Sequence, residues 1–94
     1  MLFYIKARID ITRLAELGQK LFSGELERSQ TVSAYCLKDD PEVGVNIWET
    51  ENKDELNRLL AQYKPYFAEV IEIQEIIKPM DAFVILQKKL SGIK

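Results

Sequence analysis

Apolar and polar residues alternate along residues 2–9, the period-2 pattern typical of a strand with one buried face. Similar segments, rich in β-branched and aromatic side chains, recur at 31–38, 43–48 and 68–77. The pattern predicts four strands. The acidic, proline-containing connection at 39–42 is short enough to join the two middle strands as a hairpin.

A first helix is predicted between the first two strands. From residue 11 to 22, leucines and an isoleucine recur every three or four positions, which makes one apolar stripe. Asp10 is the expected N-cap, and Gly24 supplies the backbone freedom that a helix end favours. Gly18 weakens the helix and indicates a close approach to the sheet.

A second helix is predicted between the third and fourth strands. Asn52 and Glu55 have the spacing of a capping box, and Pro65 ends the helix. The order β-α-β-β-α-β is the split βαβ pattern, so the expected fold class is α+β: a ferredoxin-like two-layer sandwich with both helices on one face of an antiparallel sheet. With 94 residues, the chain is expected to be a single domain over 1–94.

The C-terminal segment, residues 78–94, goes beyond what this fold needs. Its apolar run at 82–86 suggests a fifth strand along a sheet edge, in the same subunit or in a partner, because exposed edges invite aggregation. A short C-terminal helix is the alternative.

The alternation also predicts which residues share each face of the sheet. The face under the helices is expected to hold Phe3, Ile5, Ala7, Val32, Ala34, Cys36, Val45, Ile47, Ile71 and Ile73, with Cys36 as an inert core residue. The uncovered face is where function is sought. Its candidate ligand-binding residues are Tyr4, Lys6, Arg8, Tyr35, Asn46, Trp48, Glu72 and Gln74, bordered by Ser33, Leu2, Leu37, Val70 and Ile76.

Two interpretations of the uncovered face remain open. Two such sheets could face each other as a homodimer interface, with Glu72 paired to Lys6 or Arg8, and this interpretation is favoured. Alternatively, the packed sheets leave a cleft for a small molecule, walled by aromatic residues and anchored by the charged ones.

Composition narrows the classes of protein. A chain with 47% hydrophobic and 30% charged residues is globular, and a net charge of −2 argues against nucleic acid. No apolar run approaches the ~20 residues that span a bilayer, and Lys6 and Arg8 interrupt any signal peptide. Cys36, the single cysteine, suits a reducing compartment, so a cytoplasmic location is expected.

No motif for a cofactor or a metal is visible. The acidic cluster Asp39, Asp40 and Glu42 lacks the organised oxygens and the glycine of a calcium loop, so it is interpreted as a solvated turn. The expected cofactor and metal content is therefore none.

Two stretches resemble a known family. The opening Met1–Lys6 is similar to the first strand of muconolactone isomerase-like proteins, and Asn46–Thr50 followed by Pro65–Phe67 has the layout of their second half. These proteins belong to the dimeric α/β-barrel superfamily, in which two ferredoxin-like sheets pack face to face. The resemblance implies this fold and a homodimer. The superfamily includes small isomerases, heme-degrading and quinol-forming monooxygenases, and ligand-binding regulatory domains.

The sequence departs from that superfamily in having no histidine, the residue that many of its enzymes use as acid, base or heme ligand. The first hypothesis is therefore a homodimeric module that binds a small molecule or has a structural role. The second is an isomerase or cofactor-independent monooxygenase for a cyclic or aromatic compound, with Glu72 and Tyr35 handling protons. The third is an accessory domain that recruits a protein through 82–90.

Overall fold

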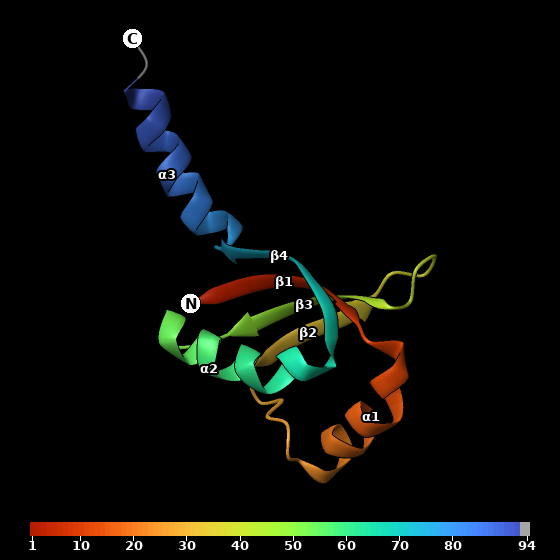
Figure 1. The fold of residues 1–94 in the computed structure, drawn as a ribbon. Coiled ribbons are helices and arrows are strands. Elements are labelled where there is room, and N and C mark those ends of the chain that lie inside the picture. The colour runs from red at the N-terminus through yellow and green to blue at the C-terminus, as the bar shows by residue number, and fades with distance from the viewer. Residues whose placement is uncertain (93–94) are drawn as a thin grey trace.

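The computed structural model describes residues 1–92. One antiparallel sheet has the strand order β2-β3-β1-β4, and both α1 and α2 lie on the same side of it (Figure 1). This topology confirms the α+β, ferredoxin-like prediction. The elements in chain order are β1 (Leu2–Ile9), the 3₁₀ helix η1 (Ile11–Arg13), α1 (Leu14–Ser23), β2 (Thr31–Cys36), β3 (Val43–Glu49), α2 (Lys53–Tyr63), the 3₁₀ helix η2 (Lys64–Tyr66), β4 (Phe67–Ile76) and α3 (Pro79–Ser91).

The predicted caps form as local chemistry requires. The Asp10 side chain accepts a hydrogen bond from the Thr12 backbone, and Gly24 ends α1 with φ of 81°, in the left-handed region. At α2, Asn52 accepts from the Glu55 backbone N–H at 2.9 Å. The 3₁₀ helix η1 and the helix α2 therefore each begin at a side chain that satisfies an otherwise unpaired N–H.

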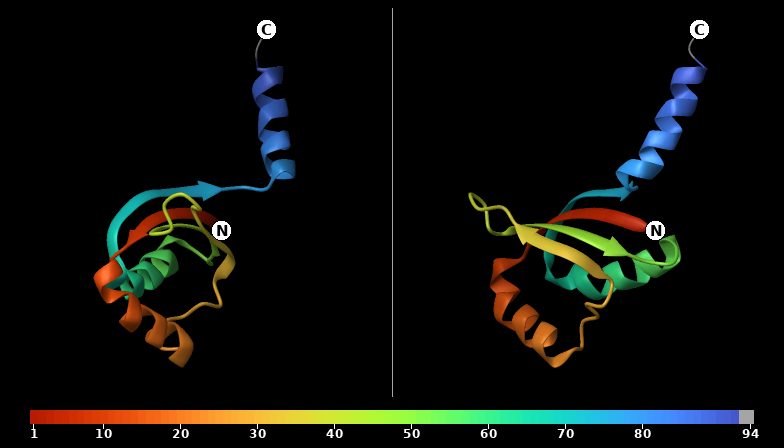
Figure 2. Two further views of the ribbon diagram at one scale, coloured as in Figure 1. Left: turned by 90° about the vertical axis from the view of Figure 1, so that its right-hand side faces the viewer. Right: turned by 180° about the vertical axis from the view of Figure 1, so that it is seen from behind.

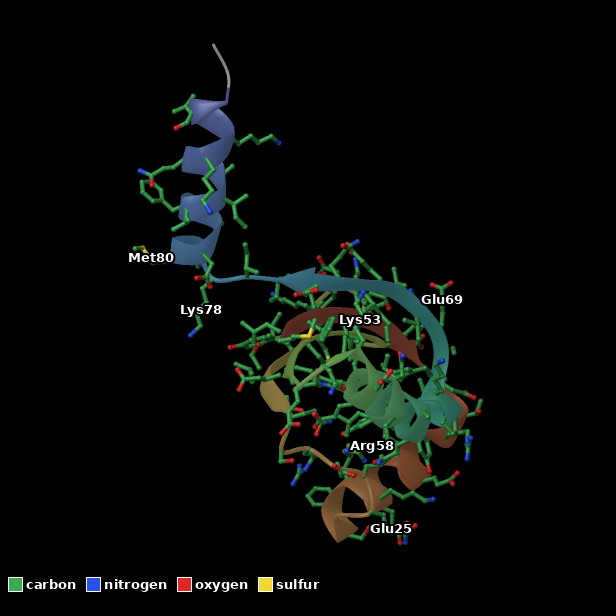
Figure 3. The ribbon with its side chains drawn as sticks, turned by 90° about the vertical axis from the view of Figure 1, so that its left-hand side faces the viewer. Glu25, Lys53, Arg58, Glu69, Lys78 and Met80 are labelled. Atoms are coloured by element: carbon green, nitrogen blue, oxygen red, sulfur yellow. The ribbon has the colours of Figure 1, made fainter. Side chains whose placement is uncertain are left out.

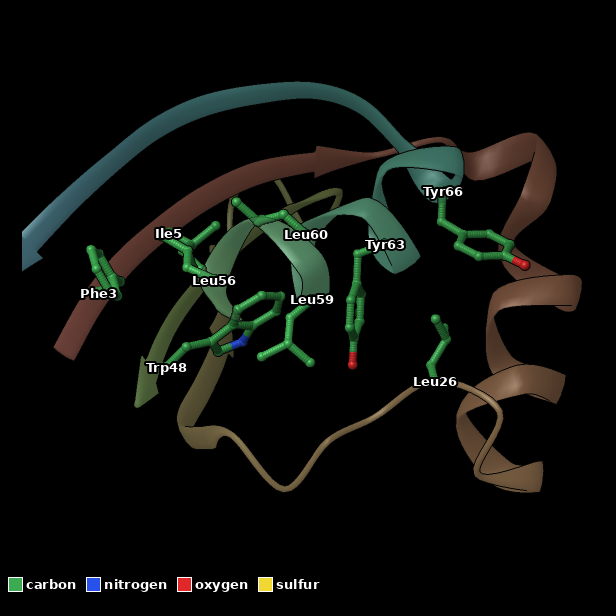
Figure 4. Close-up of a cluster of buried hydrophobic side chains, with 9 residues drawn as sticks. All are labelled: Phe3, Ile5, Leu26, Trp48, Leu56, Leu59, Leu60, Tyr63 and Tyr66. Carbon is green, nitrogen blue, oxygen red and sulfur yellow. The ribbon is translucent and has the colours of Figure 1, made fainter. Parts of the chain in front are cut away.

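The core lies between β1, β3 and α2 (Figure 4). Phe3 and Ile5 of β1 are almost fully buried, as is Leu59 of α2. The four periodic apolar residues of α2 are all buried, which confirms its predicted face. The cluster consists of Phe3, Ile5, Leu26, Trp48, Leu56, Leu59, Leu60, Tyr63 and Tyr66.

The prediction for the two faces of β3 is wrong. Trp48 lies opposite Phe3 and Asn46 opposite Ile5 in the β1–β3 ladder, so both residues share the helix-covered face. Val45 and Ile47 lie opposite Lys6 and Tyr4, and therefore face the uncovered side. Both faces of this strand carry apolar residues, so alternation alone does not identify the buried one. The pairing register decides it.

Three more predicted core residues are exposed. Ala34 and Cys36 pair with Asn46 and Gly44, which puts them on the helix side, but no helix covers them there and both are exposed. Val32 lies at a register irregularity of β2 and is 61% exposed. Cys36 is therefore accessible and is not the inert core residue that was expected.

On β4 two register irregularities against β1 lie beyond Ile73, which keeps its predicted place opposite Ile5 and is nevertheless exposed. Ile71 and Ile73, predicted as core, keep 40% and 38% of their surfaces exposed. Val70 lies opposite Ala7, on the side of the helices rather than on the uncovered side. Bulges of this kind re-aim side chains and break strict alternation.

The C-terminal segment is the helix α3, so the predicted fifth strand at 82–86 is wrong and the alternative is correct. Pro79 occupies the first turn, and Lys88 and Lys89 the last, positions that suit proline and the helix dipole. The helix projects away from the sheet (Figures 1 and 2). The last two residues of the C-terminal segment, 93–94, lie outside the described residues. Within residues 1–92, no helix is long and apolar enough to cross a membrane.

Candidate ligand-binding site

A cavity of about 810 Å³ lies between α1 and the β2–β3 half of the sheet. No residue of α1 is buried, although its leucines recur at helical spacing. A Cβ added at Gly18 would meet nothing within 4 Å, so the expected close approach of this glycine to the sheet is wrong. The helix stands off from the strands. The cavity is lined by Ile9, Leu17, Leu21, Arg28, Ser29, Thr31, Ala34, Tyr35, Cys36, Gly44, Asn46, Trp48, Tyr63 and Phe67.

One end of α1 is fastened to the segment that follows α2. The Arg13 guanidinium lies 4.7 Å from the centre of the Tyr66 ring and donates to the Pro65 carbonyl at 2.6 Å. The Tyr66 hydroxyl donates to Glu16, 3.3 Å away, and Glu16 also pairs with Arg13 at 2.9 Å. Hydrogen bonds from Arg13 lower the pKa of Glu16. Tyr66 thereby links the start of α1 to the segment between α2 and β4.

The opposite side of the cavity is closed by the loop between α1 and β2, which is fastened to α2. The buried Tyr63 hydroxyl donates to the Glu27 carbonyl at 2.6 Å, and Gln30 Nε2 donates to the same oxygen at 2.8 Å. The Glu27 carboxylate accepts from Arg58 at 2.8 Å and from Gln62 at 3.1 Å, and the Arg58 hydrogen bond is the main reason why its pKa is lowered. Because these contacts are to α2, the loop keeps its position without α1 filling the space.

Three aromatic rings form one continuous wall. The Trp48 and Tyr63 ring centres are 5.1 Å apart and tilted by 55°, and those of Tyr63 and Phe67 are 6.1 Å apart and stacked. Figure 4 shows Trp48 and Tyr63 side by side on the inner side of the sheet. Burial raises the pKa of Tyr63, so this hydroxyl stays protonated at neutral pH. Such a wall suits a flat apolar ligand.

The cavity also has polar lining residues, from the loop before β2, from β2 and from β3: Arg28, Ser29, Thr31 and Asn46. Arg28 is exposed, and within residues 1–92 it makes no ion pair or side-chain hydrogen bond. A guanidinium without a carboxylate partner can bind an anionic or oxygen-bearing group of a ligand. No carboxylate or histidine is among the described residues that line the cavity.

The candidates predicted from the sequence separate into two groups. Tyr35, Asn46 and Trp48 border the cavity. Asn46 and Trp48 lie on the helix side of the sheet, whereas Tyr35, opposite Val45, has the expected position on the uncovered face. The other five have the positions expected for them on the uncovered face: Tyr4, Lys6, Arg8, Glu72 and Gln74. Their role in binding stays a prediction, as does that of Glu72 and Tyr35 in catalysis.

Within one chain Glu72 pairs with neither Lys6 nor Arg8 among the described residues, and the pairing expected at a homodimer interface stays a prediction. Arg8 instead binds Asp40 at 2.7 Å and Glu42 at 3.2 Å, in the turn between β2 and β3. The Arg8 hydrogen bond lowers the pKa of Asp40. The solvated turn is thus fastened to β1. Lys6 lies directly opposite Glu72 in the β1–β4 ladder, but no ion pair between them forms within the described residues.

The sequence interpretation missed Arg28, Tyr63 and Phe67. A signal for the aromatic pair exists: Tyr63 and Phe67 flank the Pro65 that ends α2, so both rings are held at the point where the chain enters β4. No signal marks Arg28, because a cation in a polar loop is ordinarily solvated. Within residues 1–92, no group of three or more metal-ligating side chains comes together.

Comparison with known proteins adds little to this geometry. No protein-family model matches the sequence, and no curated protein is significantly similar to it. The fold is similar to a crystal structure described as a "putative Antibiotic biosynthesis monooxygenase from Chloroflexus aurantiacus J-10-fl", with 16% identity and a TM-score of 0.47 over 82% of this chain and 90% of that chain. At this low sequence identity and TM-score, the similarity concerns only the path of the backbone and assigns no residue a role.

Proposed function

We propose that the protein binds a small, largely apolar ring compound that carries an anionic or oxygen-bearing group, in the cavity between α1 and the sheet. The observation that carries the proposal is the cavity of about 810 Å³, whose lining combines an aromatic wall with polar groups. This volume lies within the ~300–1,000 Å³ of ordinary small-molecule pockets. A ligand ring would contact Phe67, the partly buried member of the aromatic wall, where Trp48 and Tyr63 border the cavity, and Arg28 would attract the charged group.

Binding accounts for these residues better than the isomerase or monooxygenase alternatives do. Moving a proton between two carbons requires a group that gives and takes protons near neutral pH. The ionisable side chains around the cavity are Arg28, Tyr35, Cys36 and Tyr63, of which Tyr63 has its pKa raised by burial. Glu72, the predicted proton carrier, lies on the opposite face and is exposed.

The chain carries its own reporters for this test. Trp48 is the only tryptophan and Cys36 the only cysteine, and both border the cavity. Anilinonaphthalene sulfonate, an apolar aromatic anion, should bind, quench or shift Trp48 fluorescence, and slow the reaction of Cys36 with a thiol reagent. Ala34→Phe places a ring in the cavity from an exposed wall position, and should weaken binding about tenfold or more.

The charge of the ligand gives a second, finer test. Arg28→Gln should weaken binding of naphthoate about threefold to tenfold and leave neutral naphthalene methanol unchanged. Phe22→Gln, at a ring that is 91% exposed and does not line the cavity, is the matched control for non-specific dye binding and should change neither affinity. A dye that binds Ala34→Phe as tightly as the parent chain and leaves Cys36 unprotected would contradict the proposal.

A further inference from the structure

Among the described residues, the helix α3 exposes more large apolar side chains than any other element. None of its residues is buried. In Figure 3 Lys78 and Met80 mark its base, and the helix rises from there clear of the sheet. No side-chain hydrogen bond or ion pair links it to residues 1–76 among the described residues. Its large apolar residues are 50–75% exposed: Met80, Phe83, Val84, Ile85, Leu86 and Leu90.

A helix of this kind is not stable without a surface to pack against. Isolated helices of about 12–15 residues are marginal in water, and α3 has 13. Proteins rarely leave so many neighbouring apolar side chains to solvent unless another surface covers them. The question is which surface receives α3.

The charges of the chain identify a complementary surface on a second copy. Residues 1–76 carry nine Lys or Arg and fourteen Asp or Glu, a formal net charge of −5. Residues 77–94 carry four Lys and one Asp, a net charge of +3. Residues 77–94 of one copy, the arm, are therefore attracted to residues 1–76 of another copy, the body, and two arms repel each other.

The uncovered sheet face has both features that such an arm needs. Its apolar residues include the half-buried Val45 and Ile47, whose side chains share this face with Tyr4. Around them lie the exposed carboxylates of Glu49, Glu69 and Glu72, opposite Leu2, Arg8 and Lys6 in the ladders. None of these three carboxylates makes an ion pair within residues 1–92. Lys88 and Lys89, in the last turn of α3, complement them.

We infer that two copies of the chain associate as a symmetric pair and exchange arms, so that α3 of each copy lies on the uncovered sheet face of the other. Burying one large apolar side chain removes roughly 60–120 Å² from water. With half of the apolar side chains of each arm buried, the two arms and the faces that receive them bury about 1,000 Å². That is close to the ~1,200–2,000 Å² of a stable interface. The inference is independent of the ligand cavity, which lies on the other side of the sheet.

Sedimentation analysis of the full chain tests this inference at micromolar concentration. The parent chain should be a dimer, and Phe83→Glu with Leu86→Glu should be a monomer with unchanged strand content by circular dichroism. Phe22→Glu, at a phenyl ring that is 91% exposed on α1, is the matched control and should remain dimeric. A monomeric parent chain would overturn the inference and leave α3 to a different protein or to a lipid surface.

Two further variants distinguish arm exchange from other dimers. Ile47→Glu on the sheet face should dissociate the pair, whereas a dimer held by contacts between the two α3 helices alone would survive it and refute the exchange. Lys88→Glu with Lys89→Glu should raise the dissociation constant roughly tenfold. Mixing that variant with Glu49→Lys and Glu72→Lys should restore a heterodimer. Failure of the mixture to associate would show that these charges do not meet.

Discussion

The helices α1 and α2 have similar apolar repeats, but their apolar residues are buried to very different extents. In α2 the residues Leu56, Leu59, Leu60 and Tyr63 are all buried against the sheet. In α1 none is buried, and Leu14 keeps half of its surface exposed. The difference comes from what lies beneath each helix, because α2 meets β1 and β3 directly, whereas α1 contributes only the partly buried Leu17 and Leu21 to the border of the core. Amphipathic spacing shows which face of a helix is apolar and leaves open how closely that face packs.

The largest difference in stability between variants of the two helices is expected when a leucine of each is replaced by alanine. Leu59→Ala on α2 removes a side chain that is 1% exposed, and should lower the free energy of unfolding by about 2–5 kcal/mol. The matched change on α1, Leu14→Ala, should alter it by no more than about 0.5 kcal/mol. Urea unfolding followed by circular dichroism measures both. Equal losses at the two leucines would show that α1 packs as closely as α2.

A smaller effect is expected from the glycine inside α1. Gly18→Ala should raise the free energy of unfolding by about 0.5–1 kcal/mol, because alanine favours the helix and the added methyl group meets no neighbour. Gly24→Ala is the control, since its φ of 81° strains any side chain, and this variant should be destabilised. If Gly18→Ala instead lost stability, the helix would be lying against the strands.

The smallest change in stability should come from lowering the pH, which weakens both the Arg13–Glu16 and the Arg58–Glu27 ion pairs. The pKa values of Glu16, on α1, and of Glu27, in the loop after α1, are lowered by hydrogen bonds from Arg13 and Arg58 respectively. A carboxylate with a lowered pKa stabilises the fold above its unfolded pKa, near 4.5, and this stability is lost as pH falls through the folded value. Glu16→Gln and Glu27→Gln should each make the melting temperature less dependent on pH between about 5 and 3. A pH dependence equal to that of the parent chain would exclude a contribution from these pairs.

Much of the fold follows from local patterns. The order of six elements, the caps at Asp10 and Asn52, and the buried residues of β1 and α2 are all predictable from spacing. The secondary structure of residues 82–86 is harder to predict, because a short apolar run suits either a strand or a helix. The proline and lysine positions that favour the helix are weak signals.

The candidate site was predictable only in part. Tyr35, Asn46 and Trp48 were selected as ligand-binding residues, but on the wrong side of the sheet for Asn46 and Trp48, since alternation gives two faces and the register chooses between them. The cavity itself depends on the stand-off of α1. That distance is set by contacts between residues far apart in sequence, such as Arg13 with Pro65, which no local pattern reveals.

Irregular pairing at both edges of the sheet affects how the protein behaves when it is concentrated. The outer strands β2 and β4 each carry register shifts, β2 between Thr31 and Ser33 and β4 at two places along β1. A bulged edge twists away from a straight ladder and is a poor template for the edge of another molecule. Amyloid-like stacking through these strands is therefore disfavoured, even though Val32 and Tyr35 leave β2 apolar and open to solvent.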